Sequence, residues 1–325
     1  MILKKHPTIF IAFVVLVFII WLLAFIPGDA SFWLEFWWMF PVALLISLTV
    51  NTLGISGAAL FVPFFILIFP LLAEPLSVTQ SVKIGLITES FGLTSSAIAF
   101  LVFGLVDKKL AIYSALGAMP FVIIGTLVTV LIPQAVLYLL IAILLLLSVS
   151  LVYYRRIIAA RLHDEHETSD IDYTVDTGES VKITTKDKKV YRYCRTQNGY
   201  KKRFLGYGVG GLFQGAAGFG IGEMGIISMI LSHIPTRIAI GTSHLVVAST
   251  AVVAALMHIL LSEATVEAIP WNIILMNIPA VVIGGQIAPH LATKLKPEVL
   301  EKALIMLFSV IAFSLILLAF GSINP

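Results

Sequence analysis

Two glycine-rich stretches carry the polar groups best suited to binding a ligand. They are Asn51-Thr-Leu-Gly-Ile-Ser-Gly57 and Gly215-Ala-Ala-Gly-Phe-Gly-Ile-Gly-Glu-Met-Gly225, and each interrupts an apolar run. A helix that begins after such a break presents N–H groups without an intrahelical partner and a positive dipole end, which together suit an anion. We therefore expect two short helices, starting near Gly57 and Gly222, to face a shared anion site.

Polar side chains and glycines around the two breaks complete this candidate site. The predicted substrate-binding residues are Asn51, Thr52, Gly54, Ser56, Gly57, Gln80, Ser81, Lys83, Gln214, Gly218, Gly220, Gly222, Thr242, Ser243 and His244. The neutral side chains would hydrogen-bond anion oxygens, and the glycines would let the backbone come close. The alternative is that glycine only permits tight helix packing. Packing suits the isolated glycines, whereas the matched pair of breaks favours a binding site.

Four ionisable residues lie within apolar runs, where a charge is costly and usually functional. Glu89 is interpreted as a proton carrier; a pairing with Lys83, or a structural hydrogen bond, is the alternative. Glu223 is assigned to proton coupling as well, or else caps the second short helix. Lys83 either attracts the anion or extends toward the headgroups. His244 either contacts the proton or anion, or is a hydrogen-bonded core histidine.

The composition of the chain indicates which kind of structure positions these candidate site residues. With 59% hydrophobic and 12% charged residues and a mean hydropathy of +1.02, the 325-residue chain is predicted to be a polytopic membrane protein. The apolar runs lack the alternation of a transmembrane β-barrel, so helices are expected. Full spans are predicted at about 8–26, 78–103, 110–132, 134–154, 238–261, 268–290 and 299–320. A retained first helix at 1–30 is preferred to a cleaved signal peptide.

Two longer apolar runs, 38–70 and 204–232, are predicted to enter the membrane and turn back at their breaks. Lysine and arginine concentrate in a polar insert at 157–203 and in short loops, which the positive-inside rule places in the cytoplasm. With two re-entrant hairpins, all of the 21 Lys and Arg residues except Lys83 fall on that side. Acidic residues flank the first hairpin and basic residues the second, so the hairpins should enter from opposite sides.

This layout predicts an all-α membrane protein built from two inverted repeats. Each repeat, at 38–156 and 204–321, holds a glycine-broken hairpin and three transmembrane helices; one N-terminal helix and a small cytoplasmic insert are additional. Local matches support the repeat: Pro120-Phe-Val-Ile-Ile-Gly125 is similar to Pro279-Ala-Val-Val-Ile-Gly284. Inverted repeats with interrupted helices are typical of secondary transporters, whose sites lie near the midplane.

The chain resembles a known family at these motifs. The glycine-rich break that runs into an apolar segment with Val62-Pro63, and Gly241-Thr-Ser243 at the start of a span, resemble the sulfite exporter TauE/SafE family. The resemblance covers about Pro41 to Phe320, without the first helix and the insert. It implies a permease for sulfite, organosulfonates or related sulfur acids. Gln80 departs from the pattern, which tends to have Thr there, and 51–57 has fewer glycines than is typical.

The polar insert alternates as a β-hairpin would, at 181–185 and 190–194 around a charged turn. Its acidic and histidine-rich run, His163–Glu167, is interpreted as solvated rather than metal-binding. No metal, cofactor or nucleic acid is expected. The insert would regulate transport or mediate assembly, and a homo-oligomer is left open.

The preferred function is a secondary transporter, an exporter of small sulfur-containing anions, in a cell (inner) membrane among lipids. A channel with a static filter is one alternative. An intramembrane enzyme is another, for which Glu223 and His244 are the conceivable catalytic pair.

Overall fold

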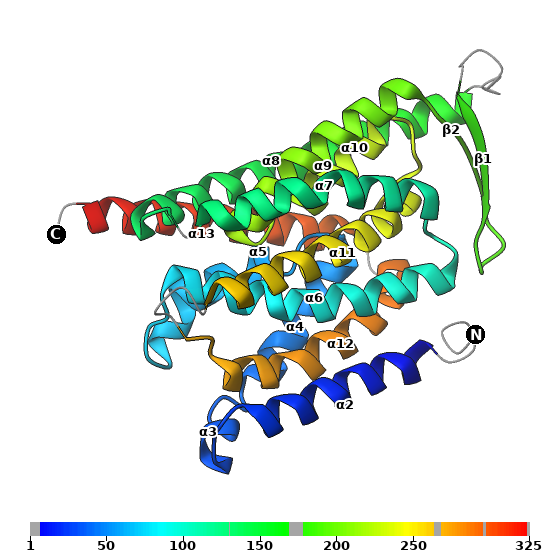
Figure 1. The fold of residues 1–325 in the computed structure, drawn as a ribbon. Helices are drawn as coiled ribbons and strands as arrows, with labels where there is room; N and C mark the ends of the chain where they lie inside the picture. Colours follow the sequence, from blue (N-terminus) through cyan, green and yellow to red (C-terminus); the bar gives the residue numbers. More distant parts are fainter. Residues whose placement is uncertain (1–6, 130, 169–177, 263–267, 295–296, 324–325) are drawn as a thin grey trace.

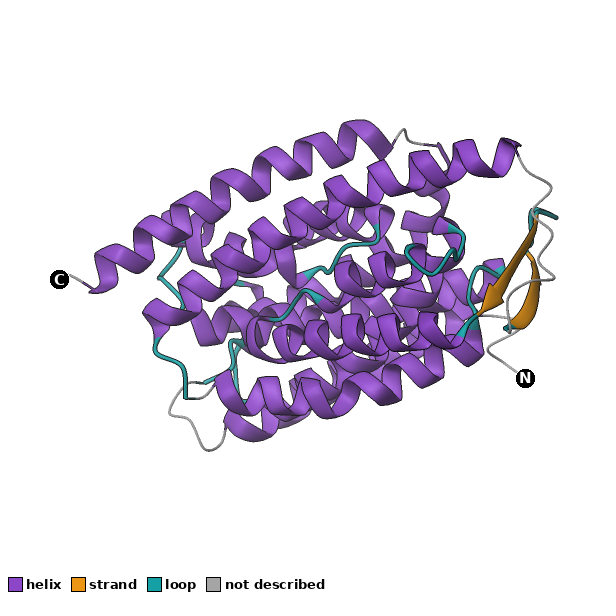
Figure 2. Ribbon diagram, turned by 90° about the horizontal axis from the view of Figure 1, so that it is seen from above, coloured by secondary structure: helices purple, strands orange, loops and turns teal. Residues whose placement is uncertain are grey.

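The protein is a bundle of helices with a small β-hairpin at one end (Figure 1). The computed structural model describes residues 7–129, 131–168, 178–262, 268–294 and 297–323. Its long, continuous helices are α2 (Pro7–Phe25), α6 (Val78–Phe103), α7 (Lys108–Thr129), α8 (Gln134–Thr168), α11 (Thr236–Ser262), α12 (Trp271–Lys294) and α13 (Pro297–Ile323). Figure 2 shows non-helical segments inside the bundle as well as at its ends.

The two apolar runs with glycine-rich breaks are interrupted helices. α3 (Ala30–Leu34) leads into α4 (Met39–Leu53), which is followed after the break by α5 (Ala58–Pro63). A π-helical stretch, Phe64–Ile68, and a 3₁₀ turn, Phe69–Leu71, continue α5. In the second run, α9 (Gln197–Ala217) is followed by α10 (Ile221–Ile230). Neither run is an unbroken rod.

Seven stretches of the described residues are long and apolar enough to cross a membrane. Six correspond to predicted spans, but the seventh differs. The segment expected at 8–26 is shorter, with Ile9–Phe25 as its apolar part, and Ala30–Leu53 qualifies instead. The sequence prediction missed this stretch because it started the segment at residue 38, whereas Asp29 caps α3 by accepting a hydrogen bond from Phe32 N.

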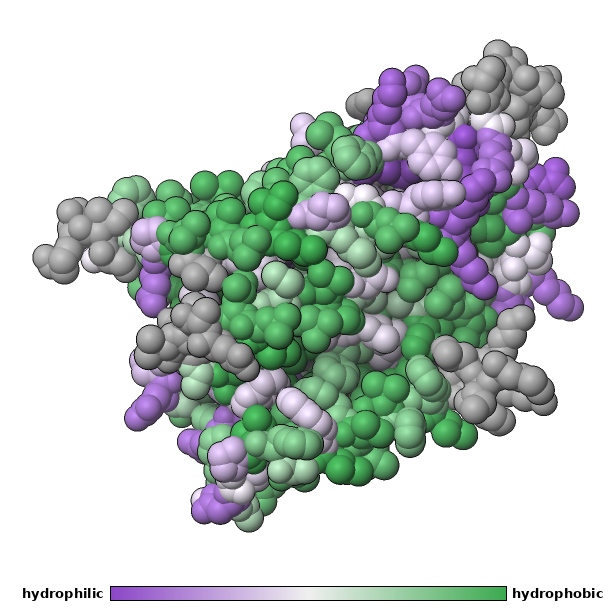
Figure 3. All heavy atoms as spheres, viewed as in Figure 1, coloured by the Kyte–Doolittle hydropathy of each residue, from purple (hydrophilic) through white to green (hydrophobic). Residues whose placement is uncertain are grey.

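The outside of the bundle has the surface expected for lipid. Large side chains such as Phe13 in α2, Ile112 in α7 and Phe313 in α13 are more than half exposed. Figure 3 shows hydrophobic residues across the middle of the molecule and hydrophilic residues gathered near the β-hairpin. Since lipid cannot satisfy backbone groups, helices whose hydrogen bonds are internal are the favoured spanning structure. The protein is a multi-pass membrane protein.

Each interrupted helix turns back at its break. Ser47 of α4 packs on Gly284 of α12, and Glu35 before α4 accepts a hydrogen bond from Asn272, so α4 runs parallel to α12. In α5, Gly57 lies against Glu89 and Val62 against Gly85, so α5 runs antiparallel to α6. Figure 1 shows α12 and α6 running in the same direction. The chain therefore enters the bundle along α4 and returns along α5.

The second interrupted helix enters from the other end. α9 runs parallel to α7, since Phe204 lies beside Gly117 and Ala216 beside Thr129. α10 returns antiparallel to α9, with Gly206 against Ser228. α6 and α7 are joined by a short turn and run in opposite directions in Figure 1. α4 and α9 therefore approach the middle of the bundle from opposite ends.

The polar insert contains the hairpin that its alternating pattern predicts. β1 (Glu179–Thr184) pairs antiparallel with β2 (Val190–Arg195), with Glu179 opposite Arg195 and Thr184 opposite Val190. Lys186 N donates to Phe103 O at 3.0 Å, which joins the turn of the hairpin to the end of α6. The end of the bundle that carries β1 and β2 is called the hairpin end below.

The domain limits expected from the sequence, at 1–30, 38–156, 157–203 and 204–321, remain predictions.

Helices α7 and α9 approach each other at backbone distance. A Cβ atom on Gly125 would lie 2.1 Å from Leu212 O, and one on Gly215 would lie 2.2 Å from Val122 O. Packing of this closeness is what small residues permit between membrane helices. At Gly125 and Gly215, glycine therefore permits the close packing of two helices.

We predict that Gly125→Ala lowers the melting temperature of the purified protein in detergent. The added methyl group would force α7 and α9 apart, and such overpacking costs about 1–3 kcal/mol. Gly321→Ala in α13 is the matched control, because a Cβ there would meet nothing within 4 Å. Equal melting temperatures for the two variants would contradict the close packing.

Candidate functional site

The first break, between the end of α4 at Leu53 and the start of α5 at Ala58, is only a few residues long. Gly54, at φ 73°, closes α4, and its N–H donates to Val50 O. A left-handed residue of this kind is the usual helix C-cap, and glycine adopts it without a Cβ penalty. Ser56 and Gly57 follow after Ile55, and the Ala59 and Leu60 amides donate to their carbonyl oxygens. The polar groups of Ser56 and Gly57 thus lie at the N-terminal end of α5.

The second break has two left-handed glycines close together. Gly218, at φ 93°, closes α9 with its N–H on Gln214 O, and Gly220, at φ 111°, precedes α10. Met224 N donates to Gly220 O and forms the first hydrogen bond of α10. The N–H groups of Ile221 and Gly222 precede that bond and belong to the helix start, where no intrahelical acceptor is available.

The two breaks meet inside the bundle. Ser56 Oγ lies 3.4 Å from Gly218 O. A Cβ on Gly218 would lie 3.0 Å from the Cβ of Ala58, and a Cβ on Gly222 would lie 3.9 Å from Ser56 N. The residues from both breaks that the sequence singles out are therefore neighbours, although they are far apart in the chain.

Glu89 of α6 joins the first break. Its Oε1 atom accepts a hydrogen bond from Ser56 Oγ at 2.5 Å and another from Gly57 N at 3.1 Å. Its Oε2 atom is buried and has no hydrogen-bond partner among the described residues. Glu223, in the first turn of α10, lies close enough for its charge to act on Glu89. Two buried carboxyl groups therefore belong to this junction.

Neutral polar atoms near the breaks are left without partners. Among the described residues, Asn51 Oδ1, Thr52 Oγ1 and both amide atoms of Gln214 are buried and accept or donate no hydrogen bond. Asn51 Nδ2 donates to Ser47 O at 2.8 Å, which fixes the amide group. A buried polar atom without a partner costs about 1–3 kcal/mol, so these atoms indicate a place for a polar ligand or water.

His244 and Ser243 of α11 lie near the same region. Ser243 Oγ donates to Gly222 O at 3.3 Å at the start of α10. His244 Nδ1 is hydrogen-bonded to Ile240 O at 2.9 Å, its ring lies 4.7 Å from the ring of Phe100, and its Nε2 has no partner among the described residues. Ser243 therefore contacts the second break, while His244 offers one ring nitrogen to a ligand.

Three predicted residues are engaged elsewhere. Gln80 and Ser77 form a reciprocal capping box at the start of α6, where Ser81 also donates to Ser77 O. Thr242 Oγ1 accepts a hydrogen bond from Asp107 N toward the hairpin end. From Gln80 to Glu89 the helix advances about 14 Å, at 1.5 Å per residue. Among the described residues, none of these three side chains has a hydrogen bond to either break, and their role at the anion site stays a prediction.

Lys83 is buried, with 2% of its surface exposed. The interpretation that it extends to the headgroups is therefore disfavoured, because an extended side chain would be exposed. Its charge acts on His258 of α11. Lys83 thus belongs to the interior of the bundle.

Two further polar side chains support the second break. His258 Nε2 lies 2.9 Å from Gly215 O, and Thr129 Oγ1 donates to Ala216 O at 3.0 Å. They satisfy the last carbonyl groups of α9, which have no intrahelical donor. Asn277, in the second turn of α12, donates to Thr88 at 3.5 Å and keeps Oδ1 without a partner among the described residues. The sequence could have singled out Asn277, because an amide side chain is unusual within an apolar span. The contacts of His258 and Thr129 with the second break can be recognised only in the tertiary structure.

The hairpin end is fixed by a separate ionic cluster. Asp107, between α6 and α7, accepts hydrogen bonds from Arg195 Nη2 at 2.6 Å, from Arg195 Nε at 2.8 Å and from the Tyr193 hydroxyl at 2.7 Å. Burial alone would raise the pKa of Asp107, but the hydrogen bonds from Arg195 and Tyr193 hold that pKa below its ordinary value. Because Thr242 contacts the Asp107 amide, this cluster links the hairpin to α11. The side chains of His163–Glu167 lie outside the described residues.

Comparison with known proteins identifies the family. A family model described as sulfite exporter TauE/SafE matches residues 39–315, from the first residue of α4 into α13. The matched range includes both breaks and the hairpin between them. No curated protein and no solved structure matches the chain.

We predict that docking of the hairpin weakens in acid. A carboxyl group whose pKa is lowered by folding stabilises the fold fully above its unfolded pKa of about 3.9 and loses that contribution as the pH falls through its folded value. Hydrogen exchange of the β1 and β2 amides, corrected for the intrinsic pH dependence, should show falling protection between pH 5 and the acid range. Asp107→Asn should show low protection throughout, while Glu74→Gln, at an exposed site away from the hairpin, should follow the native protein. Constant protection of the native hairpin would contradict the role of Asp107.

Proposed function

The chain belongs to the sulfite exporter TauE/SafE family, and on this premise we propose that it is a secondary transporter that exports a small sulfur-containing anion, such as sulfite or an organosulfonate. Members of the family are membrane transporters and not enzymes. Family membership implies transport of a sulfur anion. The substrate, the direction of transport and the mechanism below are the proposal.

The meeting of the two breaks is the observation that supports this function. Irregular backbone within a membrane protein is tolerated where protein or water satisfies it, and it commonly lines a transport site. Here the start of α10, Ser56, Gln214 and Asn51 surround the junction. A small oxyanion would accept hydrogen bonds from the Gln214 amide group and from the N–H groups that precede the first bond of α10, while the free Asn51 Oδ1 would accept one from water or from a protonated ligand.

Alternating access follows from the arrangement of the interrupted helices. We take the two segments at 38–156 and 204–321 as inverted repeats, with the substrate site between them. α4 with α5 and α9 with α10 approach from opposite ends, so the junction between the breaks could open toward one end of the bundle while it stays closed toward the other. The site would thus be reached from one side of the membrane at a time.

Glu89 is proposed to couple proton movement to anion movement. An ionised Glu89 places negative charge at the junction, and two like charges at short distance in a medium of low dielectric constant repel strongly. An anion would therefore bind more readily after Glu89 takes up a proton. An ionised Glu223 would add to this repulsion of the anion, and its negative charge also acts on Glu89.

The charge distribution gives the proposed orientation. Lys109 pairs with Glu179 of β1, and Arg237 pairs with Asp187 in the turn of the hairpin, so these basic residues lie at the hairpin end. By the positive-inside rule this end, with the insert, would face the cytoplasm of a cell (inner) membrane.

We predict anion flux by the purified protein in vesicles. Radiolabelled sulfite loaded on one side should exchange across the membrane in its presence, with saturation at high concentration as expected for a carrier. Protein-free vesicles are the control. Absence of flux for sulfite, sulfate, thiosulfate and taurine in both directions would overturn the proposed function. Single-channel currents would replace the carrier by a channel.

A second prediction concerns the proton. Glu89→Gln should lose accumulation of the anion driven by a pH gradient, because a glutamine carries no exchangeable carboxyl proton, while exchange without a gradient persists. Glu74→Gln removes one exposed carboxyl group and is the matched control. Both variants are measured in the same vesicles with and without a gradient. An equal response of Glu89→Gln and the native protein to the gradient would refute the coupling.

A further inference from the structure

The ionic cluster at the hairpin end contains one basic residue more than it contains acids, with Lys109, Arg195 and Arg203 against Glu179 and Asp107. Glu179 accepts contacts from Lys109 at 2.7 Å and from Arg195 at 3.0 Å, and Arg195 also binds Asp107 at 2.6 Å. The carboxylates of Glu179 and Asp107 are therefore already paired with Lys109 and Arg195. Arg203, near the start of α9, has no recorded carboxylate contact among the described residues.

Arg203 is buried, and the acid whose charge acts on it, Asp107, is already bound by Arg195. Only 2% of its surface is exposed, and its Nε and Nη2 atoms have no hydrogen-bond acceptor among the described residues. Its guanidinium lies 4.6 Å from the centre of the Tyr200 ring, a cation–π contact. That contact does not satisfy the N–H groups, and a buried charged donor without an acceptor is strongly unfavourable. An anion would supply the missing acceptor.

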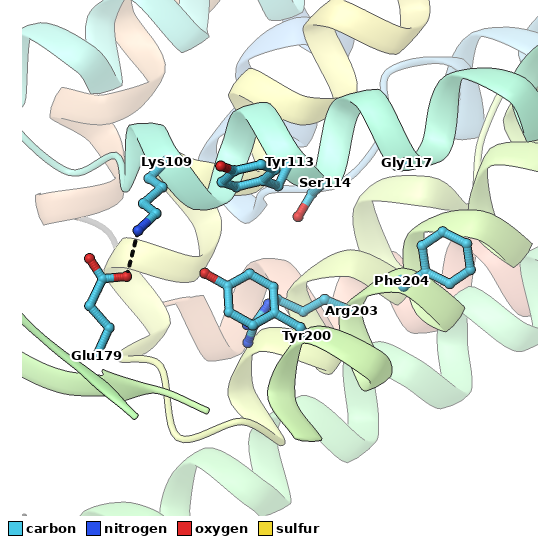
Figure 4. A pocket seen from close by; sticks show the side chains of 8 residues that line it. All are labelled: Lys109, Tyr113, Ser114, Gly117, Glu179, Tyr200, Arg203 and Phe204. Carbon is cyan, nitrogen blue, oxygen red and sulfur yellow. Dashed lines mark hydrogen bonds and ion pairs between the residues drawn. The ribbon is translucent and has the colours of Figure 1, made fainter. Parts of the chain in front are cut away.

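A cavity of about 520 Å³ lies beside Arg203. Figure 4 shows it between α7 and the start of α9, with Lys109 and Glu179 on one side, the Tyr200 ring pointing toward α7, and the Arg203 guanidinium behind that ring. Ser114 of α7 offers a hydroxyl group to the same space. The Glu179 carboxylate also lines the cavity, but Lys109 and Arg195 neutralise it.

The outer wall of the cavity is apolar and exposed. Tyr113 of α7 and Phe204 of α9 are each 58% exposed and line the cavity, and Leu205 next to Phe204 is 68% exposed. On a membrane protein such side chains face lipid. The cavity therefore has a cationic inner part at the level of the hairpin and an aromatic opening toward the acyl chains.

We propose that this cavity binds the phosphate group of an anionic phospholipid. Arg203 would donate hydrogen bonds to the phosphate oxygens, with Lys109 and the Ser114 hydroxyl beside them, and the acyl chains would lie along Tyr113 and Phe204. A guanidinium fits phosphate because its N–H groups form a planar fork. Basic pockets between membrane helices near the cytoplasmic side are suited to such headgroups.

This lipid site is separate from the proposed substrate site. Arg203 and Gly218 lie on the same helix, and the helix advances roughly 22 Å between them. A bound phospholipid would join the start of α9 to α7 and to the hairpin, whereas the substrate anion would bind at the other end of α9. The aromatic opening favours a lipid over a free anion, because a free anion gains nothing from exposed apolar walls.

Retention of phosphatidylglycerol by the delipidated protein, measured by native mass spectrometry and by the melting temperature, tests the proposal without any transport assay. Arg203→Gln should bind this lipid roughly tenfold to a hundredfold more weakly, as expected for loss of charge-assisted hydrogen bonds. Lys201→Gln removes the same charge from an exposed neighbouring position and should bind as the native protein does. Ser114→Leu fills the cavity without altering Arg203, and it should weaken binding while the melting temperature without lipid is kept.

Three results would overturn the proposal. The first is equal retention by Arg203→Gln and Lys201→Gln, and the second is equal retention of phosphatidylcholine, which carries no net charge. The third is stabilisation by millimolar inorganic phosphate or sulfite with none by phosphatidylglycerol, which would make the cavity a site for a free anion. If Arg203→Gln fails to fold, unchanged lipid retention by Ser114→Leu still rejects the site.

Discussion

The hydrogen bonds between Glu89 and the first break are the interaction on which the interior depends. A broken helix inside a membrane exposes N–H and C=O groups to a medium that cannot satisfy them, and each such group costs several kcal/mol. Glu89, held on the continuous helix α6, accepts from Ser56 Oγ and Gly57 N. Ser56 in turn contacts Gly218 O of the second break. One carboxyl group therefore holds α5 in place and, through Ser56, brings the breaks together.

The same interaction makes the junction suitable for exchange of anions. The Glu89 carboxyl group already occupies the end of α5 that would otherwise attract an oxyanion, so an incoming anion must bind beside it or replace it. In the proposed mechanism, protonation of Glu89 removes the repulsion and weakens its hold on Gly57 N, since a neutral carboxyl oxygen is a poorer acceptor. Anion binding and rearrangement of the first break would then be linked by one proton.

The sequence predicts the local features well and the long-range contacts poorly. Glycines with positive φ mark both breaks, and the alternation at 181–194 marks the hairpin, because each depends on neighbours in the chain. The proximity of Glu89 to Gly57 depends on how α5 packs on α6, which no local pattern encodes.

Other contacts of the polar residues have the same origin. Gln80 and Ser81, which the sequence analysis assigns to the site, take part in the cap at the start of α6, and their role in substrate binding stays a prediction. His258 lies near the end of α11, and its sequence neighbours give no sign of its contact with the second break. Its partner, Gly215 O, is brought there only by the tertiary fold.

The packing also restricts how the proposed repeats can move. α7 and α9 belong to different repeats and touch at Gly125 and Leu212 at a distance that leaves no room for a Cβ. α4 and α12, again from different repeats, touch similarly at Ser47 and Gly284. Sliding one sequence half past the other would break both contacts, and closely packed interfaces resist gradual displacement. The bodies that move during alternating access should therefore each combine helices from both repeats, with α7 moving together with α9 and α4 together with α12.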